Sequence, residues 1–219
     1  MAGPLNPEGK KHRFGKAWMQ EHVHDHYVQE AKRRGYRSRA AFKLLELDAR
    51  DKLIRPGMTA VDLGAAPGSW SQVLHERIGS RGRIVAVDIL PMDPVAGVTF
   101  VQADFREDAG LAAVQQALEG RPVDLVVSDM APNLSGVEPA DQARSVHLCE
   151  LALDFAISHL HAGGDLAVKV FQGSGLAELQ KAMAARFAKV YVRKPKSSRD
   201  RSRETFLVAK GFRAGTGVD

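Results

Sequence analysis

Three aspartates are placed where they could contact a nucleoside. Asp62, Asp88 and Asp104 each lie at or just after the end of a short apolar segment that predicts a β-strand. In nucleotide-binding sheets, an acidic residue at the position of Asp88 accepts the ribose hydroxyls. Three carboxylates would repel a pyrophosphate, but they suit a nucleoside with a positive centre, such as S-adenosylmethionine. The alternative is that they merely cap loops and helices.

The loop after the first of these strands reads Asp62–Trp70 (DLGAAPGSW). Its small residues, including Gly64 and Gly68, allow the backbone to approach a ligand beside a helix N-terminus. A dinucleotide fingerprint needs G-x-G-x-x-G, which this loop lacks, and Pro67 has no N–H for a pyrophosphate. The loop therefore disfavours a nicotinamide-dependent oxidoreductase. We expect Trp70 to border the adenosine site, although it could simply pack in the core.

Lys169 stands in an otherwise apolar strand, Asp165–Phe171 (DLAVKVF). Charged side chains are rarely buried without a partner, and Asp129, after the strand Val123–Ser128, is the candidate. A lysine held in this way can orient or deprotonate a hydroxyl group. The alternative is a lysine whose ammonium extends from the strand end into solvent.

Short β-branched segments alternate with helical ones from Gly57 onward, which predicts a mostly parallel sheet covered by helices on both faces. The last two strands are joined by about a dozen residues without a helix, so they can pair antiparallel. Gly163 and Gly164 are expected to end a long helix. The predicted strands are Met58–Leu63, Arg83–Asp88, Val98–Ala103, Val123–Ser128, Asp165–Phe171, Lys189–Arg193 and Thr205–Lys210, and the predicted helices are Ser38–Asp48, Trp70–Ile78, Gly110–Leu118, Ala140–Leu160 and Leu176–Phe187.

The net charge of +5 over 219 residues is unevenly distributed. Residues 1–55 carry 13 Lys and Arg against 7 Asp and Glu, and residues 190–213 carry 8 against 2, so each segment has a net charge of +6. Residues 56–189 have a net charge of −6. Two basic ends around an acidic centre are typical of a protein that binds a polyanion, although two solvated charged faces would look similar.

Composition favours a single globular domain without a membrane segment or secretory signal. Cys149 is the one cysteine, so no intrachain disulfide is expected; we predict a reducing, cytoplasmic location and a core position for Cys149. The spacing of His22, His24 and His26 fits no structural zinc pattern. We interpret these histidines as a solvated or RNA-facing helix start and expect no metal.

Six motifs taken together resemble the FtsJ/RrmJ family of ribosomal RNA 2′-O-methyltransferases. They are RSRAAFKL, DLGAAPGSWSQ, AVDILPMDP, SDMAPNLSG, VKVFQG and RKPKSSRDRSRETFLVA, in order from about Trp18 to Lys210. The resemblance implies a Rossmann-like class I methyltransferase fold with a seven-stranded, mostly parallel α/β sheet and one antiparallel strand. It also implies a methyl donor, S-adenosylmethionine, and a uridine of large-subunit ribosomal RNA as the acceptor, in a reaction that contributes to ribosome maturation. Ser69 departs from the family's usual second glycine.

The resemblance also assigns roles to residues. It implies a catalytic tetrad of Lys43, Asp129, Lys169 and Glu204. The donor contacts that we expect, from the resemblance and the loop together, are Gly64, Gly68, Trp70, Asp88, Asp104 and Asp129. From the basic segments we expect Arg37, Arg39, Arg201 and Arg203 to contact RNA phosphates.

We expect a basic N-terminal extension over residues 1–36, a methyltransferase domain over 37–213 and a tail over 214–219. The protein is expected to act as a monomer on ribosomal RNA within the large subunit or its precursor. A transfer-RNA or cap ribose methyltransferase is an alternative function. A non-catalytic RNA-binding assembly factor is disfavoured because all four tetrad residues are present.

Overall fold

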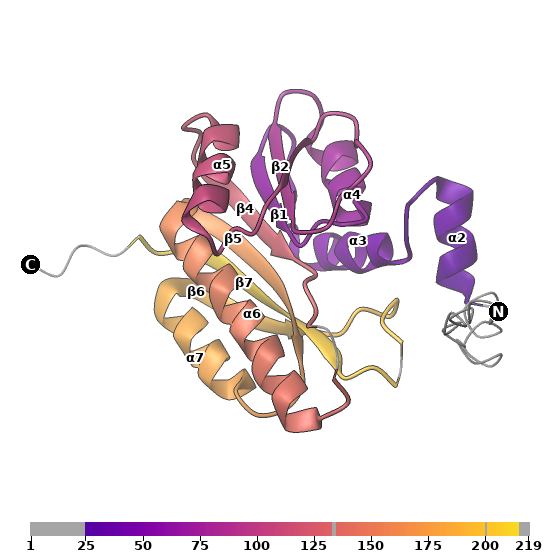
Figure 1. Ribbon diagram of the computed structural model, residues 1–219, viewed down its shortest axis with the longest axis vertical. Helices are drawn as coiled ribbons and strands as arrows, with labels where there is room; N and C mark the ends of the chain where they lie inside the picture. The colour runs from indigo at the N-terminus through magenta and orange to yellow at the C-terminus, as the bar shows by residue number, and fades with distance from the viewer. Residues whose placement is uncertain (1–24, 133–134, 200, 215–219) are drawn as a thin grey trace, which may run out of the picture.

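The computed structural model describes residues 25–132, 135–199 and 201–214. Its centre is a seven-stranded sheet with the strand order β3-β2-β1-β4-β5-β7-β6 (Figure 1). Six strands run in one direction, and β7 is antiparallel to both of its neighbours, β5 and β6. The strands are β1 (Thr59–Leu63), β2 (Arg83–Asp88), β3 (Thr99–Gln102), β4 (Val123–Ser128), β5 (Leu160–Phe171), β6 (Phe187–Arg193) and β7 (Glu204–Phe212). The predicted mostly parallel α/β sheet is confirmed.

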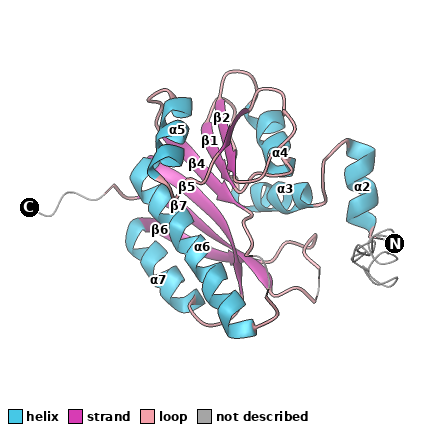
Figure 2. Cartoon of the chain, in the orientation of Figure 1, coloured by secondary structure: helices cyan, strands magenta, loops and turns pink. Residues whose placement is uncertain are grey.

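Helices cover both faces of this sheet (Figure 2). One apolar cluster joins α5, α6 and α7 to the sheet, and a second joins α2, α3 and α4 to its other face. The helices are α2 (His26–Arg34), α3 (Ala40–Asp51), α4 (Ser69–Ile78), α5 (Asp108–Leu118), α6 (Glu138–His159) and α7 (Leu176–Arg186). The central strands are apolar on both sides because neither face meets water. None of the described helices is long and apolar enough to cross a bilayer.

One detail of the long helix differs from the sequence prediction. Gly163 and Gly164 do not end the long helix, because α6 ends at His159 and the chain is already extended at Leu160, which pairs with Val123. Gly163 instead has a φ of +90° inside β5, close to where the register against β4 shifts. Left-handed backbone of this kind favours glycine.

The described part of the N-terminal extension packs on the domain through α2. Ala31 of α2 and Tyr36, which follows the helix, are buried in the same apolar cluster as α3 and α4. The side chain of Asp25 caps α2 by accepting the N–H of Tyr27 at 3.0 Å. The structure therefore holds α2 beside α3, the helix that carries Lys43.

Candidate active site

A cavity of about 610 Å³ opens where β1, β2, β3 and β4 end. This is the carboxyl edge of the parallel strands, where the strand order reverses from β1 to β4, and doubly wound sheets bind their ligands at such a point. We call it the donor cavity. Its walls include Gly64, Asp88, Asp104, Asp129, Met130 and Pro132. Its volume suits a nucleoside-sized ligand.

Asp88 is fixed for ligand binding by the loops around it. Its Oδ2 accepts the N–H of Ala66 at 2.9 Å, and its Oδ1 accepts the N–H of Leu90 at 2.8 Å. Each carboxylate oxygen has a second lone pair. Asp88 can therefore accept two ribose hydroxyls without giving up its structural contacts.

Asp104 is held by Arg106, a residue that the sequence analysis missed. The Nε of Arg106 donates to Asp104 Oδ1 at 2.8 Å, its Nη2 donates to Oδ2, and its backbone N–H donates to Oδ1 at 3.0 Å. These hydrogen bonds hold the pKa of Asp104 below its usual range. Both side chains line the donor cavity. The Asp-x-Arg spacing could have revealed this pair, because a carboxylate can accept hydrogen bonds from both the backbone N–H and the guanidinium of an arginine two residues later.

Asp62 lies beneath the cavity rather than in its wall. Its side chain is buried, and the hydroxyl of Ser71 donates to its Oδ2 at 2.7 Å. Burial raises the pKa of Asp62 to about 7, with a further contribution from the negative charges of Asp129 and Asp88 and opposition from Ser71. Asp62 therefore supports the donor loop from below.

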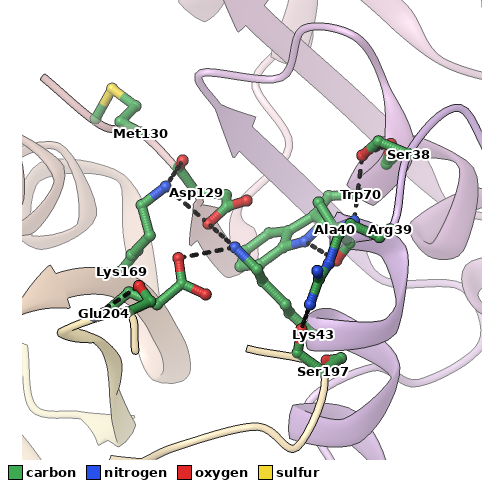
Figure 3. Close-up of polar contacts among 12 residues, drawn as sticks. Ser38, Arg39, Ala40, Lys43, Trp70, Asp129, Met130, Lys169, Ser197 and Glu204 are labelled. Atoms are coloured by element: carbon green, nitrogen blue, oxygen red, sulfur yellow. Dashed lines mark hydrogen bonds and ion pairs between the residues drawn. The ribbon is translucent and has the colours of Figure 1, made fainter. Parts of the chain in front are cut away.

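The four tetrad side chains form one continuous network (Figure 3). The Nζ of Lys169 lies 3.0 Å from Asp129 Oδ1 and donates to the Asp129 backbone carbonyl at 2.5 Å. The Nζ of Lys43 lies 3.5 Å from the same Oδ1 and 3.0 Å from Glu204 Oε2. Each side chain is more than four-fifths buried. Asp129 is thus shared by two lysines, and Lys43 joins it to Glu204.

Each tetrad residue comes from a different element. Lys43 lies in the first turns of α3, Asp129 directly follows β4, Lys169 lies near the end of β5, and Glu204 begins β7. The antiparallel register pairs Phe171 with Glu204 and Lys169 with Phe206, which brings Glu204 to the end of β5. The antiparallel pairing of β5 with β7 therefore has a direct consequence for the site.

A second hollow of about 490 Å³, which we call the acceptor groove, lies on the other side of the tetrad. Lys43 and Glu204 line it together with Ser38, Arg39, Arg199 and Arg201, whereas Asp129 lines the donor cavity. The tetrad consequently lies between the donor cavity, whose lining contains both acidic and basic side chains, and a basic groove. Asp129 on the donor side and Lys43 on the acceptor side lie 3.5 Å apart, so groups bound on the two sides would be separated by this ion pair.

Glu204 is ionised in this network. Burial by itself would raise the pKa of Glu204, but the positive charge of Lys43, assisted by Lys169, lowers it below its usual value. Two cations and two anions thus share one buried space, which is the condition for burying charge at tolerable cost.

The side chain of Trp70 is not where we expected it. The ring is buried between α3 and β7, 5.8 Å from the ring of Phe206, and its Nε1 donates to the carbonyl of Ala40 at 2.8 Å. It does not line the donor cavity.

The donor loop is closely packed at its two glycines. A side chain at Gly64 would meet Met130 Cγ at 2.3 Å, so it would push Met130 out of its place in the cavity wall. A side chain at Gly68 would meet the guanidinium of Arg37 at 2.6 Å. Both glycines also have positive φ angles. Gly64 lines the donor cavity, whereas Gly68 is buried beneath Arg37 at the start of α4.

Arg37 holds the donor loop, a contact that the sequence analysis did not predict. Its guanidinium donates to the carbonyls of Pro67, Asp93 and Pro94 at 2.7–2.8 Å. Its own N–H donates to the side chain of Gln72 at 2.9 Å. Arg37 thereby joins the turn before α3 to the donor loop and to the segment after β2. Ser69, the departure from the family motif, strengthens this junction, because its hydroxyl lies 2.7 Å from that of Ser38.

The other three arginines occupy different environments. Arg39 is largely buried, with its guanidinium on the carboxylate of Asp25 and the carbonyl of Ser197, so it also joins segments of the fold. Arg201 is exposed and lines the acceptor groove. Arg203 is half exposed and bonds Glu138 and the carbonyl of Gln172. Of the four, Arg201 keeps the position that our RNA-contact prediction requires.

Two further predictions concern cysteine and histidine. Cys149 is buried, and its Sγ lies 3.0 Å from the carbonyl of Lys169, so its predicted core position is confirmed. Burial raises the pKa of Cys149 to about 12. Within the described residues, no group of three or more His, Cys, Asp or Glu could hold a metal ion. His22 and His24 lie outside the described residues, and His26 begins α2.

Comparison with known proteins agrees with this geometry. The family model described as FtsJ-like methyltransferase matches residues 36–212. "Ribosomal RNA large subunit methyltransferase E" of Azoarcus sp. is 61% identical over 204 residues, covering 93% of this chain and 100% of that protein. The protein of the same name in Pseudomonas aeruginosa is 58% identical over 196 residues, covering 90% and 95%.

A solved structure is similar as well. It is described as a ribosomal RNA methyltransferase of Plasmodium falciparum and superposes with a TM-score of 0.72 at 32% identity, covering 81% of this chain and 98% of that one. The chain belongs to the FtsJ-like methyltransferase family. The fold is therefore that of a methyltransferase, and the donor cavity and tetrad form its candidate active site.

The position of Arg37 leads to a prediction about donor binding. Arg37→Ala removes three hydrogen bonds from a charged donor, and the donor loop loses its connection to the segment after β2. We expect the Kd for S-adenosylmethionine, measured by calorimetry, to rise about tenfold. Arg37→Lys should not restore it, because an ammonium cannot replace the guanidinium fork. Arg81→Ala, at the opposite edge of the sheet, is the control. If Arg37→Ala leaves donor affinity unchanged and weakens RNA binding, Arg37 contacts RNA and the prediction is wrong.

The raised pKa of Asp62 leads to a prediction about stability. Below pH 4 the Asp62 carboxyl is protonated in both the folded and the unfolded protein. Between pH 4 and 7 it ionises in the unfolded protein but keeps its proton in the folded one, because its pKa there is about 7. The free energy of unfolding of the wild-type protein therefore falls relative to that of Asp62→Asn as the pH rises to 7. Above pH 7 the difference between the two free energies is constant. Urea denaturation at pH 5, 6, 7 and 8 measures it. A difference that is equal at all four values would contradict the assignment.

Proposed function

We propose that the protein transfers a methyl group from S-adenosylmethionine to the ribose 2′-OH of a uridine in large-subunit ribosomal RNA. The observation that carries the proposal is the tetrad, which lies between a nucleoside-sized cavity and a basic groove. The names of the relatives support ribosomal RNA as the acceptor. We further propose that it acts as a monomer in the cytoplasm, on the large subunit or its precursor, and thereby contributes to ribosome maturation.

The residues of the donor cavity fit this donor. Asp88 has free lone pairs for the ribose hydroxyls, and Asp104 stands across the cavity for the base. Asp104 pairs with Arg106 and Asp129 with two lysines, whereas Asp88 accepts uncharged backbone N–H groups, so Asp88 is the carboxylate of the cavity that favours a cationic ligand over a phosphorylated one. When bound, S-adenosylmethionine supplies a methyl group on a positively charged sulfur, which leaves as a neutral thioether.

Lys169 is the group that we assign to the acceptor hydroxyl. A 2′-OH is a weak nucleophile until its proton is removed or firmly hydrogen-bonded. Asp129 holds the Nζ of Lys169 through both its carboxylate and its carbonyl, so the position of the ammonium is fixed at the boundary of the two sites. In its deprotonated form the amine of Lys169 orients the hydroxyl and accepts its proton as the oxygen attacks the methyl group, and this returns the lysine to the ammonium. Positioning supplies much of the rate, because the reaction disperses charge rather than creating it.

Lys43 and Glu204 act from the acceptor side. Lys43 donates to Glu204 at 3.0 Å, and both side chains line the acceptor groove. Their free lone pairs and N–H groups can hold the ribose whose 2′-OH faces Lys169. Lys43 also lies 3.5 Å from Asp129, so it balances the charge of the carboxylate that holds Lys169.

The choice of acceptor is tested with labelled donor. Large ribosomal subunits, free ribosomal RNA and transfer RNA are each incubated with the protein, and nuclease digestion then maps the label. We expect label on a ribose 2′-oxygen of a uridine in large-subunit RNA, with binding that weakens steeply as salt increases. Label confined to transfer RNA would favour the alternative ribose methyltransferase. Label on a base would refute the proposal.

Substitutions separate catalysis from donor binding. We expect Lys169→Ala to lower kcat by about 10²–10⁴-fold while the donor Kd stays unchanged, because the lysine acts on the hydroxyl proton. Asp88→Ala should instead raise the donor Kd about tenfold, because it removes hydrogen bonds to a charged acceptor. Calorimetry and single-turnover methylation distinguish the two effects. Near-normal turnover of Lys169→Ala would remove that residue from the mechanism.

A further inference from the structure

A second basic hollow, which takes no part in donor binding, lies beside the acceptor groove. It has a volume of about 780 Å³, and its walls come from α2, α3 and the loop between β6 and β7. We call it the outer groove. Five cationic residues line it, against two acidic ones, and the cations are Arg34, Arg50, Arg193, Lys194 and Lys196.

The two acids leave the outer groove with a net positive charge, because five cations face them and Glu30 pairs with one of the five, Arg34. Glu30 is bonded by Arg33 and Arg34, which lower its pKa to about 2. The carboxylate of Glu46 accepts the backbone N–H groups of Lys196 and Ser197 at 2.6 and 2.9 Å. Both acids therefore already have partners, and neither forms an ion pair with Arg50 or Lys196.

Three of the cations keep their charge available. Arg50 and Lys196 are exposed, and within the described residues neither has an ion pair. Lys194 donates to the carbonyls of Ser202 and Glu204, which are uncharged partners. Arg193, by contrast, is neutralised by Asp51 at 2.6 Å. Arg50, Lys194 and Lys196 outnumber the remaining carboxylate, Glu46, so the groove presents a net positive surface.

An aromatic side chain accompanies these cations. Tyr27 of α2 lines the groove and is partly buried, and the guanidinium of Arg39 lies 5.7 Å from the centre of its ring. Its neighbour His26 is exposed and packs edge-on against it at 5.6 Å. Single-stranded nucleic acid is bound by this combination, in which cations contact phosphates and aromatic rings contact bases.

The outer groove shares two walls with the acceptor groove. Lys43 and Arg50 are seven residues apart on α3, which places them on nearly the same face and about 10 Å apart along the axis. The loop between β6 and β7 crosses α3 between them, where its backbone bonds Glu46. About three stacked nucleotides span 10 Å. One RNA strand can therefore occupy both grooves.

We propose that the outer groove binds the single-stranded RNA that flanks the acceptor nucleotide, with its phosphates at Arg50 and Lys196 and a base against Tyr27. The proposal rests on the proposed function for the identity of the nucleic acid. It adds a second contact region, separate from the tetrad, that recognises several nucleotides next to the target rather than the target itself.

The test compares two charge reversals that alter net charge equally. Arg50→Glu with Lys196→Glu changes the outer groove, and Arg81→Glu with Arg121→Glu changes exposed arginines just before β2 and just before β4, at the amino edge of the sheet. Each pair is measured by fluorescence anisotropy with two ribosomal RNA fragments. The short fragment has one nucleotide on either side of the acceptor, and the long one has eight. Thermal unfolding and the donor Kd verify that each variant is intact.

We expect the outer-groove pair to weaken binding of the long fragment at least tenfold and leave the short one unchanged. The slope of log affinity against log salt should fall by about 1.4, for two lost single-strand phosphate contacts. The control pair should stay within twofold of wild type on both fragments. Equal losses on both fragments, or no loss on either, would overturn the proposal.

Two results separate RNA binding by the outer groove from protein binding and from the methylation activity. Weaker binding to assembled subunits without weaker binding to the long RNA would indicate an acidic protein partner, and would overturn the proposal. If the wild-type protein methylates no ribosomal RNA, the proposed function fails, but the anisotropy comparison still shows whether the groove binds RNA. The neutral pair Arg50→Ala with Lys196→Ala repeats the test without introducing negative charge.

Discussion

Asp129 lies between two buried lysines, and its carboxylate interacts with both of them. A buried cation is costly unless a counter-charge and hydrogen bonds replace its water. Lys169 obtains these from the carboxylate and carbonyl of Asp129, and Lys43 from Asp129 and Glu204. Removing any member leaves another charge buried without compensation. The chain therefore has to bring α3, β4, β5 and β7 to one point, and the rest of the fold serves this requirement.

The reversal of β7 is what completes the network. If β7 ran parallel to β5, Glu204 at its start would lie at the amino edge of the sheet, away from Lys169. Because it runs antiparallel, its first residue pairs with Phe171 at the carboxyl edge, where β4 also delivers Asp129. The loop before β7 then lies over α3 and forms walls of both basic grooves. One change of strand direction thus joins the donor side to the basic acceptor side.

The basic residues divide into two groups with different partners. Arg37 and Arg39 bond backbone carbonyls or a buried carboxylate and join α3 to the donor loop and to the β6–β7 loop. Arg50 and Lys196 are exposed on the shared walls of the grooves. Arginine suits the first task because its planar fork can bond several carbonyls at once. Net charge alone does not distinguish these groups, since every member contributes equally to it.

The sequence alone determined the class of fold, the order of the strands along the chain and the tetrad, because strand periodicity is local and the six motifs are specific. It also located Asp88 and Asp104 at strand ends. Tertiary structure decided what each side chain contacts. The side chain of Trp70 packs in the core and that of Arg37 bonds three carbonyls, although nothing in their neighbourhoods in sequence required it. Those outcomes depend on segments that meet only after folding, such as Arg37 and Asp93, which are 56 residues apart.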